Sequence, residues 1–194
     1  EEFIKDSLIT LILGDNIFYG SNLTNLLKEC FLRKRGGTIF AYPVKDPERY
    51  GVIEFDDSNR VISLEEKPKI PKSKYVITGI YVFDNKVIDL AKTLKPSKRG
   101  ELEITDLLKI YLNEQNLSVN LLERGSAWLD TGNIDSLHEA SSYIRTLEHR
   151  QGLKIGCPEE IAWNNGWINN EQLLKLSKPL LKSGYGEYLI QLTQ

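Results

Sequence analysis

The sequence predicts an α/β fold: a mainly parallel, Rossmann-like sheet with an inserted hairpin and a helical C-terminal tail. An apolar run over residues 8–13, a helix-like segment over 23–34 and a second strand-like run over 38–44 give the order strand, helix, strand. That order implies a right-handed crossover and a parallel pair. Residues 51–55 and 61–65 are typical of two strands joined by a polar turn, and helical periodicity prevails after residue 135.

Each remaining element follows from a local pattern. The first run, 8–13, is closed by Gly14 and is typical of a strand buried on both faces, and the next helix can begin at Ser21 or Asn22. A strand is expected over 76–83, and Asn85 can cap a helix that ends near residue 92. Further expected elements are a helix over 104–113, strands over 117–122 and 127–129, and helices over 135–150, 158–163, 169–181 and 185–192. We expect two parts, residues 1–150 and 151–194.

Composition narrows the class of protein. The chain has 194 residues, of which 41% are hydrophobic, which is enough for a packed core. Its formal net charge of −2 disfavours nucleic acid and anionic membranes as partners, because proteins that bind them are usually basic. Cys30 and Cys157 lie far apart, so both are expected to be reduced. Since neither a membrane span nor a signal peptide is recognisable, a cytoplasmic protein is expected.

Two aspartates directly follow apolar runs. Asp15 comes after residues 11–14, and Asp130 comes after residues 127–129. If these strands are neighbours, the two carboxylates meet at one edge of the sheet, and such a pair is a common way to hold Mg²⁺. The alternative is that Asp130 caps the helix beginning near Asn133 and that Asp15 caps the helix near Leu23.

Two other charged segments are candidates for binding an anionic sugar. Pro68 ends the strand that carries Glu66 and Lys67, so this carboxylate and ammonium project from a fixed position. Together they fit a sugar phosphate, although a solvated charge cluster at a strand end is the more common explanation for this motif taken alone. Arg99 precedes a helix, where a phosphate is also favoured, but it can instead pair with the nearby Glu101.

Nucleophilic catalysis by the protein is disfavoured. Only two histidines occur, His138 and His149, and both fall on the helix expected after residue 135. No Ser-His-Asp or Cys-His constellation is therefore plausible. Metal-assisted group transfer and ligand binding without catalysis remain as the candidate functions.

Taken together, these segments resemble the sugar-1-phosphate nucleotidylyltransferases, and most closely the bacterial glucose-1-phosphate thymidylyltransferase branch. The segments that carry the resemblance are residues 13–20, 50–55, 65–68, 78–81, 99–106, 128–132 and 157–163. Segments 15–20 and 157–163 favour the thymidylyl branch over its uridylyl and adenylyl relatives. The resemblance runs almost from end to end.

This resemblance implies a reaction and a set of site residues. The sugar phosphate oxygen of glucose 1-phosphate would attack the α-phosphorus of dTTP, giving dTDP-glucose and pyrophosphate for dTDP-rhamnose and lipopolysaccharide synthesis. The implied residues are the Mg²⁺ ligands Asp15 and Asp130, the sugar-binding Glu66 and backbone of Gly51, the phosphate-neutralising and catalytic Lys67 and Arg99, and the pocket-lining Tyr81 and Glu101.

The chain departs from the family at its start. Members begin with a strand and a loop, Gly-Gly-x-Gly-x-Arg-Leu, that cradles the triphosphate, and this sequence holds no such loop. The pair Gly36-Gly37 closes a helix and does not replace it. The resemblance therefore implies an N-terminally truncated sheet and a chain that is inactive alone. The alternative is a non-catalytic truncated homologue that binds sugar phosphate or a complete partner subunit.

The family also implies control and assembly. A regulatory nucleotide site between subunits would include Tyr19, Gly20, Arg124, Glu160 and Ile161. Asn164 stands where the family usually has arginine, so phosphate binding at that site is expected to be weaker. A homo-oligomer is expected, a tetramer by family, with residues 151–194 as the regulatory or interface region.

Overall fold

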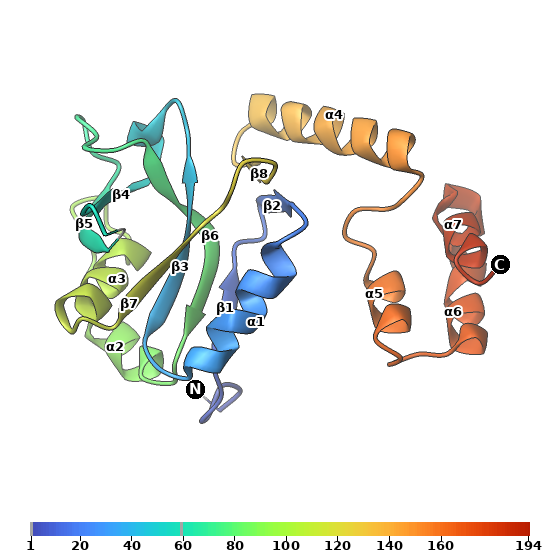
Figure 1. Ribbon diagram of the computed structural model, residues 1–194, viewed down its shortest axis with the longest axis horizontal. Helices are drawn as coiled ribbons and strands as arrows, with labels where there is room; N and C mark the ends of the chain where they lie inside the picture. The colour runs from blue at the N-terminus through green and yellow to red at the C-terminus, as the bar shows by residue number, and fades with distance from the viewer. Residues whose placement is uncertain (1, 59) are drawn as a thin grey trace. The chain divides into compact units, whose positions relative to one another are not determined.

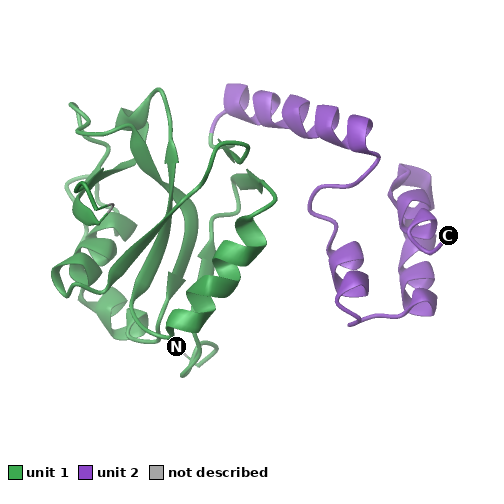
Figure 2. Cartoon of the chain, viewed as in Figure 1, with its two compact units in different colours: residues 1–132 green, residues 133–194 purple. Residues whose placement is uncertain are grey.

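The computed structural model describes residues 2–58 and 60–194, and the chain forms two compact units. Unit 1 spans residues 1–132 and unit 2 spans residues 133–194 (Figure 2). The helix expected over 135–150 thus belongs to the second unit. The functional division at residue 150 stays a prediction.

Unit 1 alternates strands and helices (Figure 1). Its elements are β1 (Ile9–Ile12), β2 (Asn16–Tyr19), α1 (Leu23–Arg33), β3 (Gly37–Pro43), the 3-10 turn η1 (Pro47–Arg49), β4 (Gly51–Phe55), β5 (Val61–Glu66), β6 (Tyr75–Phe83), α2 (Val87–Thr93), α3 (Ile104–Asn113), β7 (Leu117–Leu121) and β8 (Ala127–Asp130). All the strands and helices expected up to residue 130 are present, which confirms the α/β class. The short strand β2 was not expected.

The main sheet is mixed and not mainly parallel, so the predicted pairing was wrong. Its order is β5-β4-β6-β3-β7, and β1 also pairs with β6. The β3·β7 pair is parallel, whereas β1·β6, β3·β6, β4·β5 and β4·β6 are antiparallel. β1 and β3 run in the same direction, as the strand, helix, strand order predicted, but β6 lies between them. Side-chain periodicity identifies a strand without identifying its partner, which explains the error.

β6 is buried as a central strand of the sheet. Eight of its nine residues are buried, and most are β-branched or aromatic. Helices cover both faces of the sheet around it (Figure 1). Leu108 and Tyr111 of α3 pack on one face with Ile39, while Cys30 of α1 packs on the other face with Phe40. Unit 1 is therefore a three-layer α/β/α structure.

β1 is more exposed than its apolar sequence predicts. Leu11, Ile12 and Leu13 are 41%, 57% and 41% exposed. β1 pairs with β6 along one edge, and no described strand pairs with its other edge. The expectation that residues 8–13 are buried on both faces was therefore wrong for this chain.

Unit 2 consists of helices. They are α4 (Ile134–Gln151), α5 (Pro158–Asn164), α6 (Asn170–Ser177), the 3-10 helix η2 (Lys178–Ser183) and α7 (Tyr185–Gln191). A small core of Cys157, Leu173, Tyr188 and Leu189 holds α5, α6 and α7 together. None of the helices in the described residues is both long and apolar enough to span a membrane.

Candidate functional site

The predicted site residues of unit 1 converge on one pocket of about 220 Å³. Six of them line it: Asp15, Gly51, Glu66, Lys67, Tyr81 and Asp130. Gly51, Glu66 and Tyr81 belong to the main sheet, whereas Asp15 and Asp130 lie at the separate two-stranded sheet of β2 and β8.

A short antiparallel ladder brings the two aspartates together. β2 pairs with β8 so that Asn16 lies opposite Asp130, and Asp15 is the residue just before it. The backbone N–H and the hydroxyl of Thr131 both donate to the Asp15 carbonyl oxygen, each at 2.8 Å. The predicted convergence of these aspartates is thus seen in the structure.

The helix-capping alternative for these aspartates is wrong. The residue at the N-cap of α1 is Asn22, and β2 separates Asp15 from that helix. The N-cap of α4 is Asn133, whose side chain accepts a hydrogen bond from the backbone of Ser136. Neither aspartate therefore caps the N-terminus of a helix.

The donor chemistry of this pair suits Mg²⁺. Asp15 Oδ1 accepts a hydrogen bond from Asn16 Nδ2 at 2.8 Å, and Asp130 Oδ1 accepts one from the backbone N–H of Gly132 at 3.2 Å. No group of three or more Asp, Glu, His or Cys side chains that could hold a metal ion occurs in the described residues. Mg²⁺ is typically held by one or two carboxylates, with water and phosphate oxygens completing its shell. Asp15 and Asp130 fit that requirement.

Gly51, Glu66 and Lys67 also line the pocket. Gly51 pairs with Glu66 in the β4·β5 ladder, and a Cβ at Gly51 would lie 3.0 Å from Thr105 Cγ2 and 3.4 Å from Glu66 Oε2. Glycine therefore keeps this backbone open beside the carboxylate. Lys67 has a left-handed φ of 43°, unusual for a residue with a side chain, and its N–H donates to the Tyr50 carbonyl.

Tyr81 lies deep in the pocket wall. It is 3% exposed and belongs to β6. Burial raises the pKa of its hydroxyl, and the nearby charge of Glu66 raises it further. Tyr81 therefore stays neutral and able to donate a hydrogen bond.

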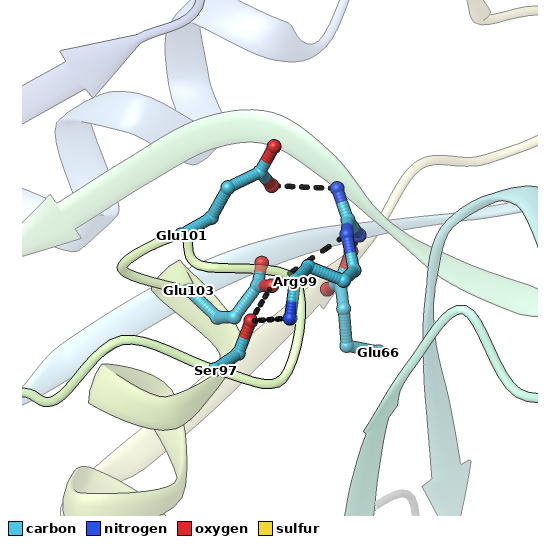
Figure 3. Close-up of polar contacts among 5 residues, drawn as sticks. All are labelled: Glu66, Ser97, Arg99, Glu101 and Glu103. Atoms are coloured by element: carbon cyan, nitrogen blue, oxygen red, sulfur yellow. Dashed lines mark hydrogen bonds and ion pairs between the residues drawn. The ribbon is translucent and has the colours of Figure 1, made fainter.

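Arg99 and Glu101 are not among the residues that line the pocket; they lie beside it on the loop before α3. The Arg99 guanidinium contacts Glu101 at 2.6 Å, Glu66 at 3.8 Å and Glu103 at 3.9 Å (Figure 3). The Ser97 hydroxyl donates to Glu103 at 2.7 Å and accepts from the backbone N–H of Arg99 at 3.1 Å. The alternative interpretation, pairing with neighbouring glutamates, therefore describes Arg99 in this structure. Its contact with Glu66 joins this cluster to the pocket.

Sequence reasoning missed several residues that line the pocket, among them Asn16, Arg49 and Thr105. Arg49 contacts Asp46 at 2.8 Å and lies 5.3 Å above the ring of Tyr50. The Thr105 hydroxyl is buried and has no hydrogen-bond partner in the described part of the chain. A usable signal for Asn16 and Thr105 is their position within one residue of a strand end or in the first turn of a helix.

Tyr50 joins Arg49 to the aspartate side of the pocket. Its ring meets Trp128 edge-on with centroids 5.1 Å apart. Burial raises the pKa of its hydroxyl most strongly, Arg49 opposes this rise, and Asp130 adds to it. The Tyr50 hydroxyl is therefore neutral beside that carboxylate.

The predicted regulatory residues fall in two units. In unit 1, Gly20 leaves room for Ser126, because a Cβ there would lie 2.8 Å from Ser126 Oγ, and Arg124 forms an isolated bridge with the same serine. Tyr19, the last residue of β2, is adjacent.

The other two members belong to α5 in unit 2. Glu160 accepts a hydrogen bond from the Tyr188 hydroxyl, and Ile161 is 52% exposed. A common nucleotide site for all five regulatory residues stays a prediction.

A family model and the relatives found among known proteins agree on one family. A family model described as nucleotidyl transferase matches residues 1–146. A glucose-1-phosphate thymidylyltransferase of Neisseria meningitidis is 52% identical over 192 residues, covering 99% of this chain and 67% of the relative. The Mycolicibacterium smegmatis protein of the same name is 56% identical over 191 residues, covering 98% and 66%. The chain thus spans about two thirds of the length of these relatives.

Solved structures agree on the fold. A protein described as a glucose-1-phosphate thymidylyltransferase from Bacillus anthracis, in complex with sucrose, has a TM-score of 0.66 and 41% identity, over 73% of this chain and 56% of that one. A UDP-glucose pyrophosphorylase complexed with UDP-glucose has the same TM-score at 18% identity, covering 75% and 59% of the two chains, and supports the fold alone.

Proposed function

Because this chain belongs to the nucleotidyl transferase family, we propose that it supplies the metal and sugar-phosphate side of a glucose-1-phosphate thymidylyltransferase site. The observation that carries the proposal is that Asp15 and Asp130 line the same pocket as the segment of Glu66 and Lys67. The names of the most similar relatives support thymidine as the base and glucose 1-phosphate as the sugar.

In the proposed reaction, a phosphate oxygen of glucose 1-phosphate attacks the α-phosphorus of dTTP. The bond from that phosphorus to the bridging oxygen breaks, and pyrophosphate leaves, so the protein need form no covalent intermediate. Asp15 and Asp130 would hold Mg²⁺, which neutralises developing charge on the phosphates. Positioning and charge stabilisation then supply most of the rate.

The segment of Glu66 and Lys67 would bind the sugar phosphate. Glu66 and the backbone of Gly51 lie side by side and would hold sugar hydroxyls. Lys67 would neutralise the phosphate, and Arg99 would reach it by exchanging one of its glutamate partners. Tyr81 and Thr105 also line the pocket and are buried, and their hydroxyls would offer further hydrogen bonds to the sugar phosphate.

Binding of the nucleotide triphosphate requires residues other than those that line this pocket. The printed sequence contains no glycine-rich loop of the kind that cradles a triphosphate. We therefore propose that turnover depends on such a loop supplied by residues other than these 194.

The decisive experiment separates binding from turnover. The purified chain is titrated with glucose 1-phosphate by calorimetry, and pyrophosphate release is followed with Mg²⁺, dTTP and glucose 1-phosphate. We expect binding that Lys67→Ala weakens at least tenfold, and turnover no faster than in Asp15→Asn. Absence of binding contradicts the proposed function. Rapid turnover contradicts the need for an outside loop.

A second function, a non-catalytic subunit that binds a partner, is favoured by one observation. Leu11, Ile12 and Leu13 at the β1 segment are 41%, 57% and 41% exposed, β1 has one described strand partner, and an exposed apolar edge strand is a template for pairing with another chain. Sedimentation of the purified chain, alone and with a complete thymidylyltransferase, distinguishes the two functions when compared with the turnover assay.

A further inference from the structure

One side chain links the buried indole of Trp128 to the carboxylate of Asp15. Trp128 Nε1 donates to Asn16 Oδ1 at 2.6 Å, and Asn16 Nδ2 donates to Asp15 Oδ1 at 2.8 Å. Trp128 is 8% exposed. The Asn16 amide therefore bridges a rigid aromatic residue and a carboxylate that lines the pocket.

The chemistry of the two neighbours fixes which way the Asn16 amide faces. An indole N–H can only donate, so the amide oxygen has to face Trp128. An ionised carboxylate can only accept, so the amide nitrogen has to face Asp15. A flipped amide would oppose two donors on one side and two acceptors on the other. Only one orientation satisfies all three groups.

The surroundings are shaped around this amide. A Cβ at Gly79 would lie 2.6–3.0 Å from the atoms of the Asn16 amide, so only glycine leaves space for it there. The Trp128 ring is held edge-on between Tyr50 and Tyr42, with centroid distances of 5.1 and 6.2 Å. The position of the Asn16 amide is therefore fixed by the packed ring of Trp128 and by the space that Gly79 leaves, and these residues line the same pocket as Asp15.

We propose that Asn16 is a positioning residue that sets Asp15 to bind a divalent cation through a single oxygen. Its hydrogen bond occupies Oδ1 and leaves Oδ2 for the ion. Monodentate carboxylates suit Mg²⁺, whereas Ca²⁺ readily takes both oxygens of one carboxylate. This inference rests on the proposed function, since it assumes that Asp15 holds the metal.

The inference predicts that residues which never touch the ion control its affinity. Loss of such a supporting hydrogen bond typically weakens metal binding by about 10–100-fold. Asn16→Ala removes the donor to Asp15. Trp128→Phe keeps the aromatic ring but removes the N–H that orients the amide, so a smaller loss in the same direction is expected.

Unit 2 offers a matched control. Trp163 Nε1 donates to Asn170 Oδ1 at 2.8 Å, which is the same indole-to-amide bond without a carboxylate beyond it. Trp163→Phe and Asn170→Ala therefore remove equivalent hydrogen bonds elsewhere in the chain.

The test uses Mn²⁺ alone, without nucleotide, as the probe on the full chain. Electron paramagnetic resonance of free Mn²⁺ gives its dissociation constant, and competition with Mg²⁺ and Ca²⁺ gives the selectivity. We expect Asn16→Ala to weaken Mn²⁺ binding about tenfold and to shift the selectivity toward Ca²⁺. Trp128→Phe should do the same by a few fold, and the unit 2 variants should match the wild type. Selectivity is a readout that loss of folding alone does not shift.

The outcomes separate this inference from the proposed function. If the wild type binds Mn²⁺ and the Asn16 and Trp128 variants behave like the unit 2 controls, the inference is overturned and the proposed function stands. If Mn²⁺ binding follows the prediction but no sugar phosphate binds, the proposed function fails and the positioning role stands. If the wild type binds no Mn²⁺, both are overturned.

Discussion

The two ends of the pocket are held in different ways. Asp15 and Asp130 are fixed by the backbone ladder between β2 and β8 and by uncharged donors such as Asn16. Arg99 instead lies on a loop and is 42% exposed, and side-chain ion pairs such as that with Glu101 hold it. Exposed ion pairs contribute only about 0–1 kcal/mol each, so they exchange easily. The metal end is therefore preorganised, whereas the phosphate end has to change partners when its ligand arrives.

The largest expected effect comes from removing charge at the preorganised end. Asp15→Asn and Asp130→Asn keep the size of each side chain but remove a metal ligand. We expect each to lower transfer by about 10³-fold or more, because a metal contributes several kcal/mol to the transition state. Pyrophosphate release in the active protein that carries this chain measures this, with thermal unfolding as the folding control. Activity within threefold of the wild type would show that these aspartates hold no catalytic metal.

At the phosphate end, a substitution should weaken ligand binding with little effect on stability. Arg99→Ala should weaken glucose 1-phosphate binding by about tenfold to a hundredfold, which corresponds to a lost charge-assisted hydrogen bond. It should change the free energy of unfolding by less than about 1 kcal/mol. Glu101→Gln is the matched variant, and it should change affinity by no more than about threefold or tighten it, since it frees the guanidinium. Calorimetry with glucose 1-phosphate measures both. An equal loss in both variants would mean that the ion pair itself has to persist in the complex.

The same contrast explains what the sequence could predict. The sequence could identify Asp15, Asp130, Glu66 and Lys67 as candidate site residues, because each follows a strand-like run, but it did not predict the β2·β8 ladder that brings the two aspartates together. These signals are local. Arg99 was left with two open interpretations, and which partner a loop side chain chooses depends on groups that pack from other elements.

Pairing between distant strands could not be read from local patterns. β6 is buried on both faces and was expected as a strand, but nothing in its residues shows that it separates β1 from β3. β2 was missed because a run of four half-buried residues after a turn is too short to show an alternating pattern. Without β2, the contact between Asn16 and Trp128 could not be foreseen.

A substitution at the buried Thr105 should change two properties in opposite directions, raising the stability of the chain while lowering its affinity for glucose 1-phosphate. Thr105→Val replaces a buried hydroxyl that has no described partner with a methyl group of similar size. We expect the free energy of unfolding to rise by about 1 kcal/mol, while affinity for glucose 1-phosphate falls. Thr78→Val is the control, because the Thr78 hydroxyl donates to the Phe40 carbonyl at 3.0 Å, and its loss should cost about 1–3 kcal/mol. Urea unfolding measures both. A loss of stability in Thr105→Val would show that its hydroxyl already has a partner.

The smallest expected effect tests whether preorganisation extends across the pocket to Lys67. Its φ of 43° is strained for a side-chain residue, which suggests that the fold holds this backbone in place for the ligand. Lys67→Gly removes a strain of about 1–2 kcal/mol but adds about 0.5–1 kcal/mol of chain entropy on unfolding. We therefore expect the unliganded chain to gain about 0.5–1 kcal/mol in urea unfolding. Lys69→Gly, nearby on an exposed segment without a positive φ, should be neutral or destabilising. Equal changes in the two variants would mean that the left-handed backbone at Lys67 costs nothing, and the preorganised region would then end at the aspartates.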